Sequence, residues 1–243
     1  MRTVFRAIAR ELRVPFVSLS KSEEKPPRSI SRPAIIFTDH SNFAKCSWII
    51  GDADSRLLHL IRDPRDIIIS AMQYHCRSTE KWLHTARKAF GGMSYQVKLN
   101  SLPDDYSRYI FEMDRSAGRV ISDIVAWNYN MRNCLECRYE ELIIDTGMTL
   151  VDAILMHFGF QGEEVEKGKR IFWDNSLFGA LQTGSSPHIR SGSTRQWRDV
   201  FDTALAQAFI DRFGDILVQI GYEPDNAWLS HCRTNPNPGD RQR

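Results

Sequence analysis

The chain has 243 residues, of which 42% are apolar and 26% are charged, and its formal net charge is +2. This length and composition suit one large globular α/β domain and exclude a fibrous, disordered or disulfide-rich miniature protein. The small net charge argues against nucleic acid as a partner, so any anion site must be local. No apolar run approaches the length of a membrane span.

The N-terminal residues predict an ordinary helix over positions 3–12, because Val4, Ile8 and Leu12 form one apolar stripe. This segment lacks the long apolar core of a signal peptide, although its arginines and small residues are also found in transit peptides. Five scattered cysteines without a secretory signal are typical of reduced thiols, which predicts a cytoplasmic protein. Cys134 and Cys137 have no partners to complete a zinc site, so no metal is expected.

The rest of the chain alternates predicted strands and helices. Strands are predicted over residues 14–19, 34–38, 57–61 and 135–139. Helices are predicted over residues 64–74, 120–131, 150–158, 163–172, 176–181 and 204–220. Such alternation is typical of a parallel, doubly wound sheet, in which the loops after the strands gather at one edge. Residues 1–234 are expected to form a single domain, and the polar tail 235–243 to be disordered.

Residues 77–115 are less periodic and contain paired glycines, a proline and many aromatic side chains. They predict helical and irregular segments that partly cover a pocket, where the aromatic side chains could bind an acceptor. A simple structural insertion is an equally good interpretation.

The segment from Leu57 to Ser70 carries the first functional signal. A short apolar strand ends on Arg62, and Asp63-Pro64 then starts a helix that carries Ser70 about two turns later. A guanidinium beside a helix N-terminus suits an anion, because it offers paired donors where backbone amides and the helix dipole also favour negative charge. The alternative is a surface arginine paired with Asp66. Strand ends are where α/β sheets bind ligands, which favours the anion site.

The sequence from Arg62 to Ser70 resembles the segment with which sulfotransferases hold the 3′-phosphate of 3′-phosphoadenosine-5′-phosphosulfate (PAPS). Three further stretches resemble this family in the same order. Tyr139 opens a tyrosine–acid–acid–leucine segment, whose tyrosine lies near the adenine in the family. Arg190, Ser191 and Gly192 precede Trp197 as in the family's late phosphate loop, with serine where lysine is common, and Trp197 and Phe201 are expected to anchor the loop to the core.

The last matching stretch contains His40, which follows Thr38-Asp39 and stands 22 residues before Arg62. The resemblance implies that His40 is the general base, a role that suits an imidazole because its pKa lies near neutrality. Asp39 could orient or replace this base. The four stretches together run from about residue 35 to about residue 222, over most of the chain.

One part of the family pattern is missing. The family begins with a buried strand and a phosphate loop with a lysine, whereas this sequence starts at a segment that resembles the first helix. The fold expected is therefore the P-loop nucleotide-kinase-like (sulfotransferase) sheet with its first strand and P-loop absent. Two hypotheses account for this. Either the sequence begins at an internal methionine of a longer protein, which we favour, or the protein is a truncated and inactive relative of the family.

The function implied is transfer of a sulfonate from PAPS to a hydroxyl or amine of a small-molecule or carbohydrate acceptor, without a metal. Two alternatives remain open. One is a non-catalytic homologue that binds a 3′-phosphoadenosine nucleotide or a protein partner. The other is a P-loop kinase that uses ATP. The sequence identifies neither the acceptor nor the oligomeric state.

Overall fold

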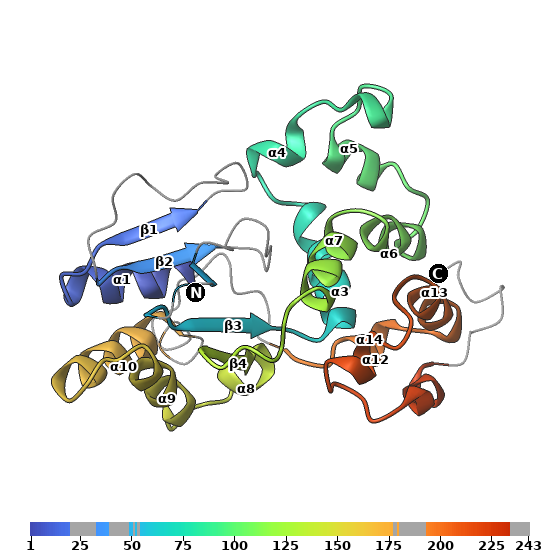
Figure 1. The fold of residues 1–243 in the computed structure, drawn as a ribbon. Coiled ribbons are helices and arrows are strands. Elements are labelled where there is room, and N and C mark those ends of the chain that lie inside the picture. The colour runs from blue at the N-terminus through green and yellow to red at the C-terminus, as the bar shows by residue number, and fades with distance from the viewer. Residues whose placement is uncertain are drawn as a thin grey trace. The chain divides into compact units, whose positions relative to one another are not determined.

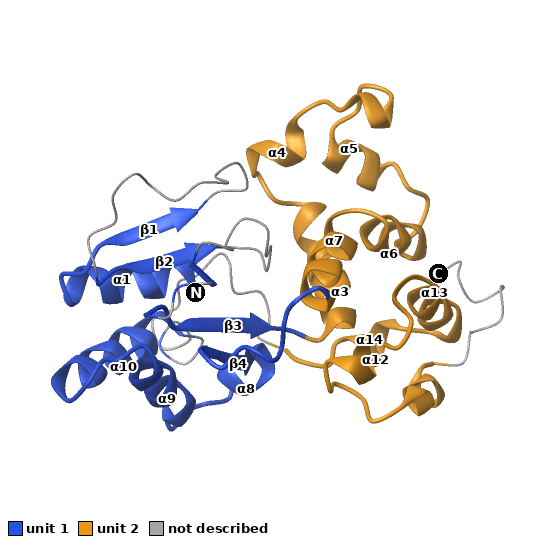
Figure 2. Ribbon diagram, in the orientation of Figure 1, with its two compact units in different colours: residues 1–62, 126–192 blue, residues 63–125, 193–243 orange. Residues whose placement is uncertain are grey.

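The computed structural model describes residues 1–19, 33–38, 49–50, 52, 54–176, 179 and 193–233. The chain forms two compact units, each built from two chain segments (Figure 2). Unit 1 comprises residues 1–62 and 126–192, and unit 2 comprises residues 63–125 and 193–243. Because the segments interleave, the division does not separate two consecutive domains, and the single domain over residues 1–234 stays a prediction. None of the helices in the described ranges is long and apolar enough to cross a membrane.

Unit 1 contains the strands. β1 (Phe16–Leu19) pairs in parallel with β2 (Ile35–Thr38), and β3 (Leu57–Ile61) pairs in parallel with β4 (Cys134–Arg138). The arrows of β2 and β3 point the same way in Figure 1. The predicted α/β class and parallel pairing are therefore confirmed. Within the described residues the strands form two separate ladders, and the predicted absence of a first strand remains untested.

The core of unit 1 lies between these strands and their helices, which are α1 (Arg2–Glu11), α8 (Tyr139–Leu142), α9 (Thr149–His157) and α10 (Glu163–Asn175). Successive side chains of a strand point to opposite sides, so alternate residues of β3 face the core and the opposite face of the strand. Leu58 and Leu60 pack against this core together with Val4 and Ile8 of α1. His59, between the two leucines, is buried on the other face.

Unit 2 is helical. Its elements are α3 (Pro64–His75), α4 (Lys81–His84), η1 (Lys88–Phe90), α5 (Tyr95–Asn100), α6 (Asp105–Met113), α7 (Ser116–Val125), α12 (Trp197–Val200), α13 (Thr203–Phe213), α14 (Ile216–Gln219) and η2 (Asn226–His231). Helix α3 packs against α6, α7 and α12 (Figure 1). Its buried side chains Ile68, Ile69 and Met72 supply the apolar face for this packing.

Three predictions of secondary structure are wrong. The helix predicted over residues 120–131 is α7, which ends at Val125 and leaves Trp127 outside it. The long final helix is interrupted, because Gly214 adopts a left-handed φ of 56° between α13 and α14. The strand predicted over residues 135–139 is β4, which ends at Arg138, and Tyr139 instead begins the short helix α8.

Candidate functional site

Arg62 and Tyr139, two of the predicted site residues, lie together in unit 1. The register of β3 and β4 places Ile61 opposite Arg138, so both strands end at the same level. The residue after each strand is then a neighbour of the other, and the Arg62 guanidinium carbon lies 4.8 Å from the centre of the Tyr139 ring. A cation at this distance from an aromatic face is attracted to it. The two strand ends therefore combine a positive charge with an aromatic surface.

The turn after Arg62 forms as the sequence predicts. The Asp63 side chain caps α3 by accepting a hydrogen bond from the Arg65 amide at 3.0 Å, and Pro64 is the first residue of the helix. Proline suits this position because the amide it lacks would have no partner within the helix. Ser70 lies on α3 and is half-buried. The boundary between the units falls between Arg62 and Asp63, so Arg62 and Ser70 belong to different units.

The other predicted site residues are His40, Arg190, Ser191 and Gly192, and they lie outside the described residues. The described residues nearest to them in the sequence are Thr38, at the end of β2, and Ser193. Their roles stay predictions.

The chain after the late loop is anchored in the core, as predicted. Trp197 and Phe201 are 2% and 0% exposed. A second anchor was not predicted. The buried carboxylate of Asp66 accepts hydrogen bonds from the backbone amides of Arg195 and Trp197, at 2.8 and 3.0 Å. Asp66 thus binds the backbone of this segment.

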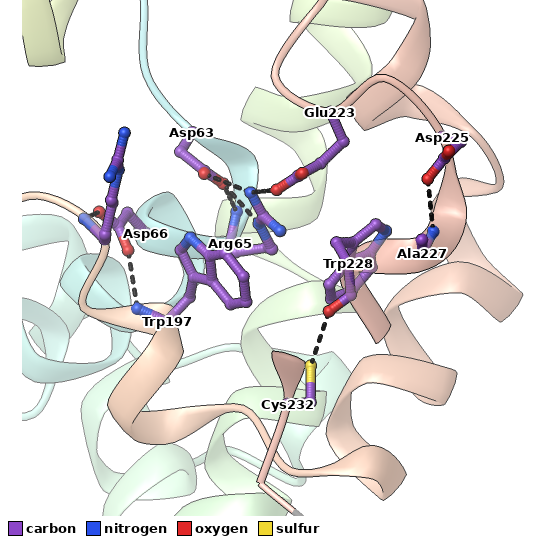
Figure 3. A network of polar contacts seen from close by, with 10 residues as sticks. Asp63, Arg65, Asp66, Trp197, Glu223, Asp225, Ala227, Trp228 and Cys232 are labelled. Atoms are coloured by element: carbon purple, nitrogen blue, oxygen red, sulfur yellow. Dashed lines mark hydrogen bonds and ion pairs between the residues drawn. The ribbon is translucent and has the colours of Figure 1, made fainter. Parts of the chain in front are cut away.

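Arg65 is the centre of a buried network that sequence reasoning also missed. Figure 3 shows its guanidinium between the carboxylates of Asp63 and Glu223, at 2.7 and 2.6 Å. The rings of Trp197 and Trp228 lie 3.6 and 4.8 Å from the guanidinium carbon. The run of alternating charges around Pro64 was the available signal, but nothing local identified these partners.

A second polar cluster lies on the face of β3 and β4 that points away from the core of unit 1. Glu136 accepts hydrogen bonds from the Trp127 indole at 2.8 Å and the Cys134 thiol at 3.4 Å, and is hydrogen-bonded to His59 at 2.7 Å. The ring of His59 stacks on Trp127 with centroids 4.0 Å apart. Burial and the Glu136 charge raise the pKa of Tyr129, which lies against His59, to about 12.

Residues 77–115 contribute a third cluster, in unit 2. Phe90, Tyr95 and Tyr109 are buried, so they pack as core side chains. His75 and Glu112, both buried, are hydrogen-bonded at 2.7 Å. Burial, and then the charge of Glu112, raise the pKa of Tyr95. The proposal that this region shapes an acceptor pocket stays a prediction.

The described part of the chain contains no group of three or more His, Cys, Asp or Glu side chains that could hold a metal ion. Its cysteines Cys76, Cys134, Cys137 and Cys232 are free thiols. Cys134 and Cys137 lie on opposite faces of β4, since Cys137 joins the core while Cys134 contacts Glu136. Burial and neighbouring carboxylates raise the pKa of both thiols to about 12. These thiols are therefore protonated and structural.

The chain was compared with known protein families. Residues 6–221 match the family described as the sulfotransferase domain. No match was found among curated proteins. The matched range begins in α1, ends after α14, and includes both strand ends that carry Arg62 and Tyr139.

Proposed function

Because the chain belongs to the sulfotransferase domain family, we propose that it transfers a sulfonate from PAPS to a hydroxyl or amine of a small-molecule or carbohydrate acceptor. The contact between Arg62 and Tyr139 carries this proposal. A 3′-phosphoadenosine needs a cation for its phosphate and an apolar, aromatic surface for its base. The ends of β3 and β4 supply these two groups 4.8 Å apart.

We assign Arg62, Ser70 and Arg190 to the 3′-phosphate, with Ser191 and Gly192 beside it, and Tyr139 to the adenine. A guanidinium can donate two parallel hydrogen bonds to a phosphate, and a hydroxyl can donate one more. Glycine lets backbone amides approach an anion closely because it has no side chain. These contacts would hold the donor by a part that does not react, which is how binding energy is used to orient a reacting group.

His40 is the proposed general base. It would accept the proton of the acceptor hydroxyl or amine as the acceptor atom forms its bond to sulfur. The bond between sulfur and the bridging phosphate oxygen breaks in the same displacement, and its electron pair remains on that oxygen. The products are the sulfated acceptor and adenosine 3′,5′-bisphosphate. As in phosphoryl transfer, positioning and charge stabilisation would dominate catalysis.

Calorimetric titration of adenosine 3′,5′-bisphosphate into the 243-residue chain tests the nucleotide site. Wild type should bind, and Arg62→Ala should lose about tenfold or more in affinity, because it removes charge-assisted hydrogen bonds. Arg56→Ala is a matched control, since Arg56 directly precedes β3 in the same unit and donates to the His157 carbonyl at 3.1 Å. It should bind as wild type does. Equal losses in the two variants, or no binding by folded wild type, would refute the assignment.

Two further measurements distinguish sulfonate transfer from the two alternative functions. Selective binding of ATP over the bisphosphate would favour a kinase. Tight binding of the bisphosphate without sulfonate transfer, in the protein with its natural N-terminus, would indicate a non-catalytic homologue.

A further inference from the structure

The loop from Ala86 to Ser94 in unit 2 is closed by its own backbone and fixes Arg87. Ala86 and Ser94 form an antiparallel bridge. The Arg87 amide donates to the Met93 carbonyl at 3.0 Å, and the Arg87 carbonyl accepts from the Gly92 amide at 3.1 Å. Gly92 has a φ of 87°, in the left-handed region that residues with a side chain rarely adopt. The backbone of Arg87 is therefore held in one conformation.

The Arg87 side chain packs against a group of aromatic rings. Its guanidinium carbon lies 5.6 Å from the centre of the Trp82 ring, 6.0 Å from that of Phe90 and 5.5 Å from that of Tyr95. The Tyr95 ring also contacts Trp82 and Phe90, with centroid distances of 5.2 and 6.1 Å. Trp82 and Tyr95 come from α4 and α5, which lie side by side (Figure 1). Cation–π attraction restricts the Arg87 side chain, so little conformational entropy is lost when its guanidinium binds a ligand.

A second guanidinium, that of Arg115, approaches the same Phe90 ring. Its carbon lies 5.8 Å from the ring centre, and that of Arg87 lies 6.0 Å from it, so the two carbons are no farther apart than the sum of these distances. Arg115 is exposed and Arg87 is half-buried. Within the described ranges, neither side chain has a hydrogen bond or an ion pair.

The carboxylates closest in sequence to these two arginines have other partners. These partners are Arg212 for Asp114 at 2.7 Å, His75 for Glu112 at 2.7 Å, and Tyr74 and Trp82 for Glu80 at 3.0 and 2.6 Å. Two guanidinium groups beside one aromatic ring are thus left without a carboxylate. Like charges repel each other, so this arrangement favours a bound anion.

We propose that Arg87 and Arg115 bind the carboxylate of an acidic ligand. A guanidinium can donate two parallel hydrogen bonds to a carboxylate, and Arg87 is already oriented by the rings beneath it. Aromatic acids and acidic sugars both carry this group. The site lies wholly in unit 2 and shares no residue with the proposed nucleotide site. The inference therefore does not depend on the proposed function.

Titrations of the isotope-labelled 243-residue chain, followed by NMR, test the class of ligand. Benzoate is compared with benzamide, and glucuronate with glucose, so that only one member of each pair carries a carboxylate. We expect a carboxylate to shift the signals of the Arg87 Nε–H group and the Trp82 indole. It should bind about tenfold more tightly than its neutral partner, the gain typical of a charge-assisted hydrogen bond.

The pair with the larger difference identifies the source of the carboxylate as an aromatic acid or a sugar acid. Equal affinity within both pairs would overturn the proposal, because the anionic group would then contribute nothing. Titrations in which no ligand shifts these signals would overturn it as well.

Arg87→Gln and Arg115→Gln should each weaken binding of the carboxylate by about tenfold. Arg198→Gln is the matched control, because Arg198 is also exposed and lies over an aromatic ring of unit 2, 5.5 Å from the centre of Trp197. It removes the same charge and should bind as wild type does. Equal losses in the three variants would show unspecific attraction to positive charge and would overturn the site.

Arg115→Gln keeps the proposal testable if Arg87→Gln does not fold, since Arg115 is exposed. This variant should bind adenosine 3′,5′-bisphosphate as wild type does. Loss of the bisphosphate in Arg115→Gln, with Arg62→Ala unaffected, would mean that the nucleotide binds here, and would overturn both proposals. Absence of bisphosphate binding by wild type would refute the proposed function alone, because carboxylate binding is measured without the nucleotide.

Discussion

His59 and Glu136 stand directly opposite each other on β3 and β4, and a hydrogen bond of 2.7 Å joins their side chains. Glu136 also accepts from Trp127 and Cys134, so one carboxylate satisfies donors from both strands and from the chain that leads into β4. Cross-strand pairs of this kind stabilise a ladder and fix its register. The same register brings the strand ends, and thus Arg62 and Tyr139, to one level.

Replacing Glu136 by glutamine should destabilise the protein by about 1–3 kcal/mol, because glutamine offers one acceptor oxygen where glutamate offers two. The variant should also lower the pKa of Cys134, which the Glu136 charge helps to raise. Urea unfolding and the rate of Cys134 alkylation measure the two effects. Glu163→Gln is the control, since Glu163 forms an exposed pair with Lys167, and it should change stability by less than about 0.5 kcal/mol. If the Glu136→Gln protein is as stable as this control, the cluster around Glu136 does not stabilise the protein as proposed.

Local signals predicted the elements that local chemistry determines. Leu57–Ile61 is apolar except for His59 and forms β3 with the predicted bounds, and α3 starts at Asp63-Pro64 as predicted. Partners distant in sequence could not be predicted in this way. Trp127 continues the apolar pattern of α7, yet it lies outside the helix because it stacks on His59 and donates to Glu136.

The same distinction between local signals and distant partners applies to the candidate site. The resemblance indicated Arg62 and Tyr139, and the ladder register brings them into contact. No pattern indicated Asp66, whose amide partners are 129 and 131 residues away. An aspartate in the first turn of a helix has an ordinary explanation in the helix dipole. Only the folded chain shows that this carboxylate is buried against Arg195 and Trp197.

Tyr139 should contribute to nucleotide binding through its ring. Tyr139→Phe should bind adenosine 3′,5′-bisphosphate nearly as wild type does, because the aromatic face for adenine and for the Arg62 guanidinium remains. Tyr139→Leu should lose about twofold to thirtyfold in affinity, since it removes an interaction worth about 0.5–2 kcal/mol. Calorimetry with both variants tests this. A large loss in Tyr139→Phe would show instead that the hydroxyl is the important group.

Arg65 should be important for stability. Its side chain is 2% exposed and pairs with Asp63 and Glu223. Arg65→Met would leave two buried carboxylates without their cation, and breaking such a pair typically costs about 3–5 kcal/mol. Arg212→Met is the control in the same unit, because the pair of Arg212 with Asp114 is partly exposed and should be worth about 1 kcal/mol or less. Urea unfolding compares them, and equal losses would refute the special role of the buried pair.

Gly118 is a position where no side chain fits. A Cβ atom there would lie 1.7 Å from the Met113 carbonyl oxygen, a backbone atom at the junction of α6 and α7. Gly118→Ala should therefore destabilise the protein by about 2 kcal/mol or more, because a backbone segment must move. At Gly147 the nearest atom is the Thr149 hydroxyl at 3.6 Å, so Gly147→Ala should be tolerated. Thermal unfolding of the two variants checks the contrast, and similar midpoints would contradict it.

The thiols of Cys134 and Cys137 should make stability fall at high pH. Their pKa values of about 12 in the folded chain exceed the ordinary thiol value of about 8.5, mainly because burial disfavours the thiolate. Between about pH 9 and pH 12 the unfolded chain loses protons that the folded chain retains, so the free energy of unfolding decreases with pH. Below about pH 9 the two thiols are protonated in both states, so their contribution to stability is fully present.

Replacing both residues by alanine removes these two ionisations. The double variant should lose less stability than wild type between about pH 9 and pH 11, even if it is less stable at neutral pH because buried volume is lost. Urea titrations at several pH values give the slope of unfolding free energy against pH for each protein. Other titrating groups contribute equally to both slopes, so their contribution cancels in the difference. Native wild type should also react slowly with iodoacetamide at both positions near pH 8.5, and quickly once it is denatured. Equal slopes, together with rapid alkylation of the native protein, would show that these thiols ionise like exposed ones.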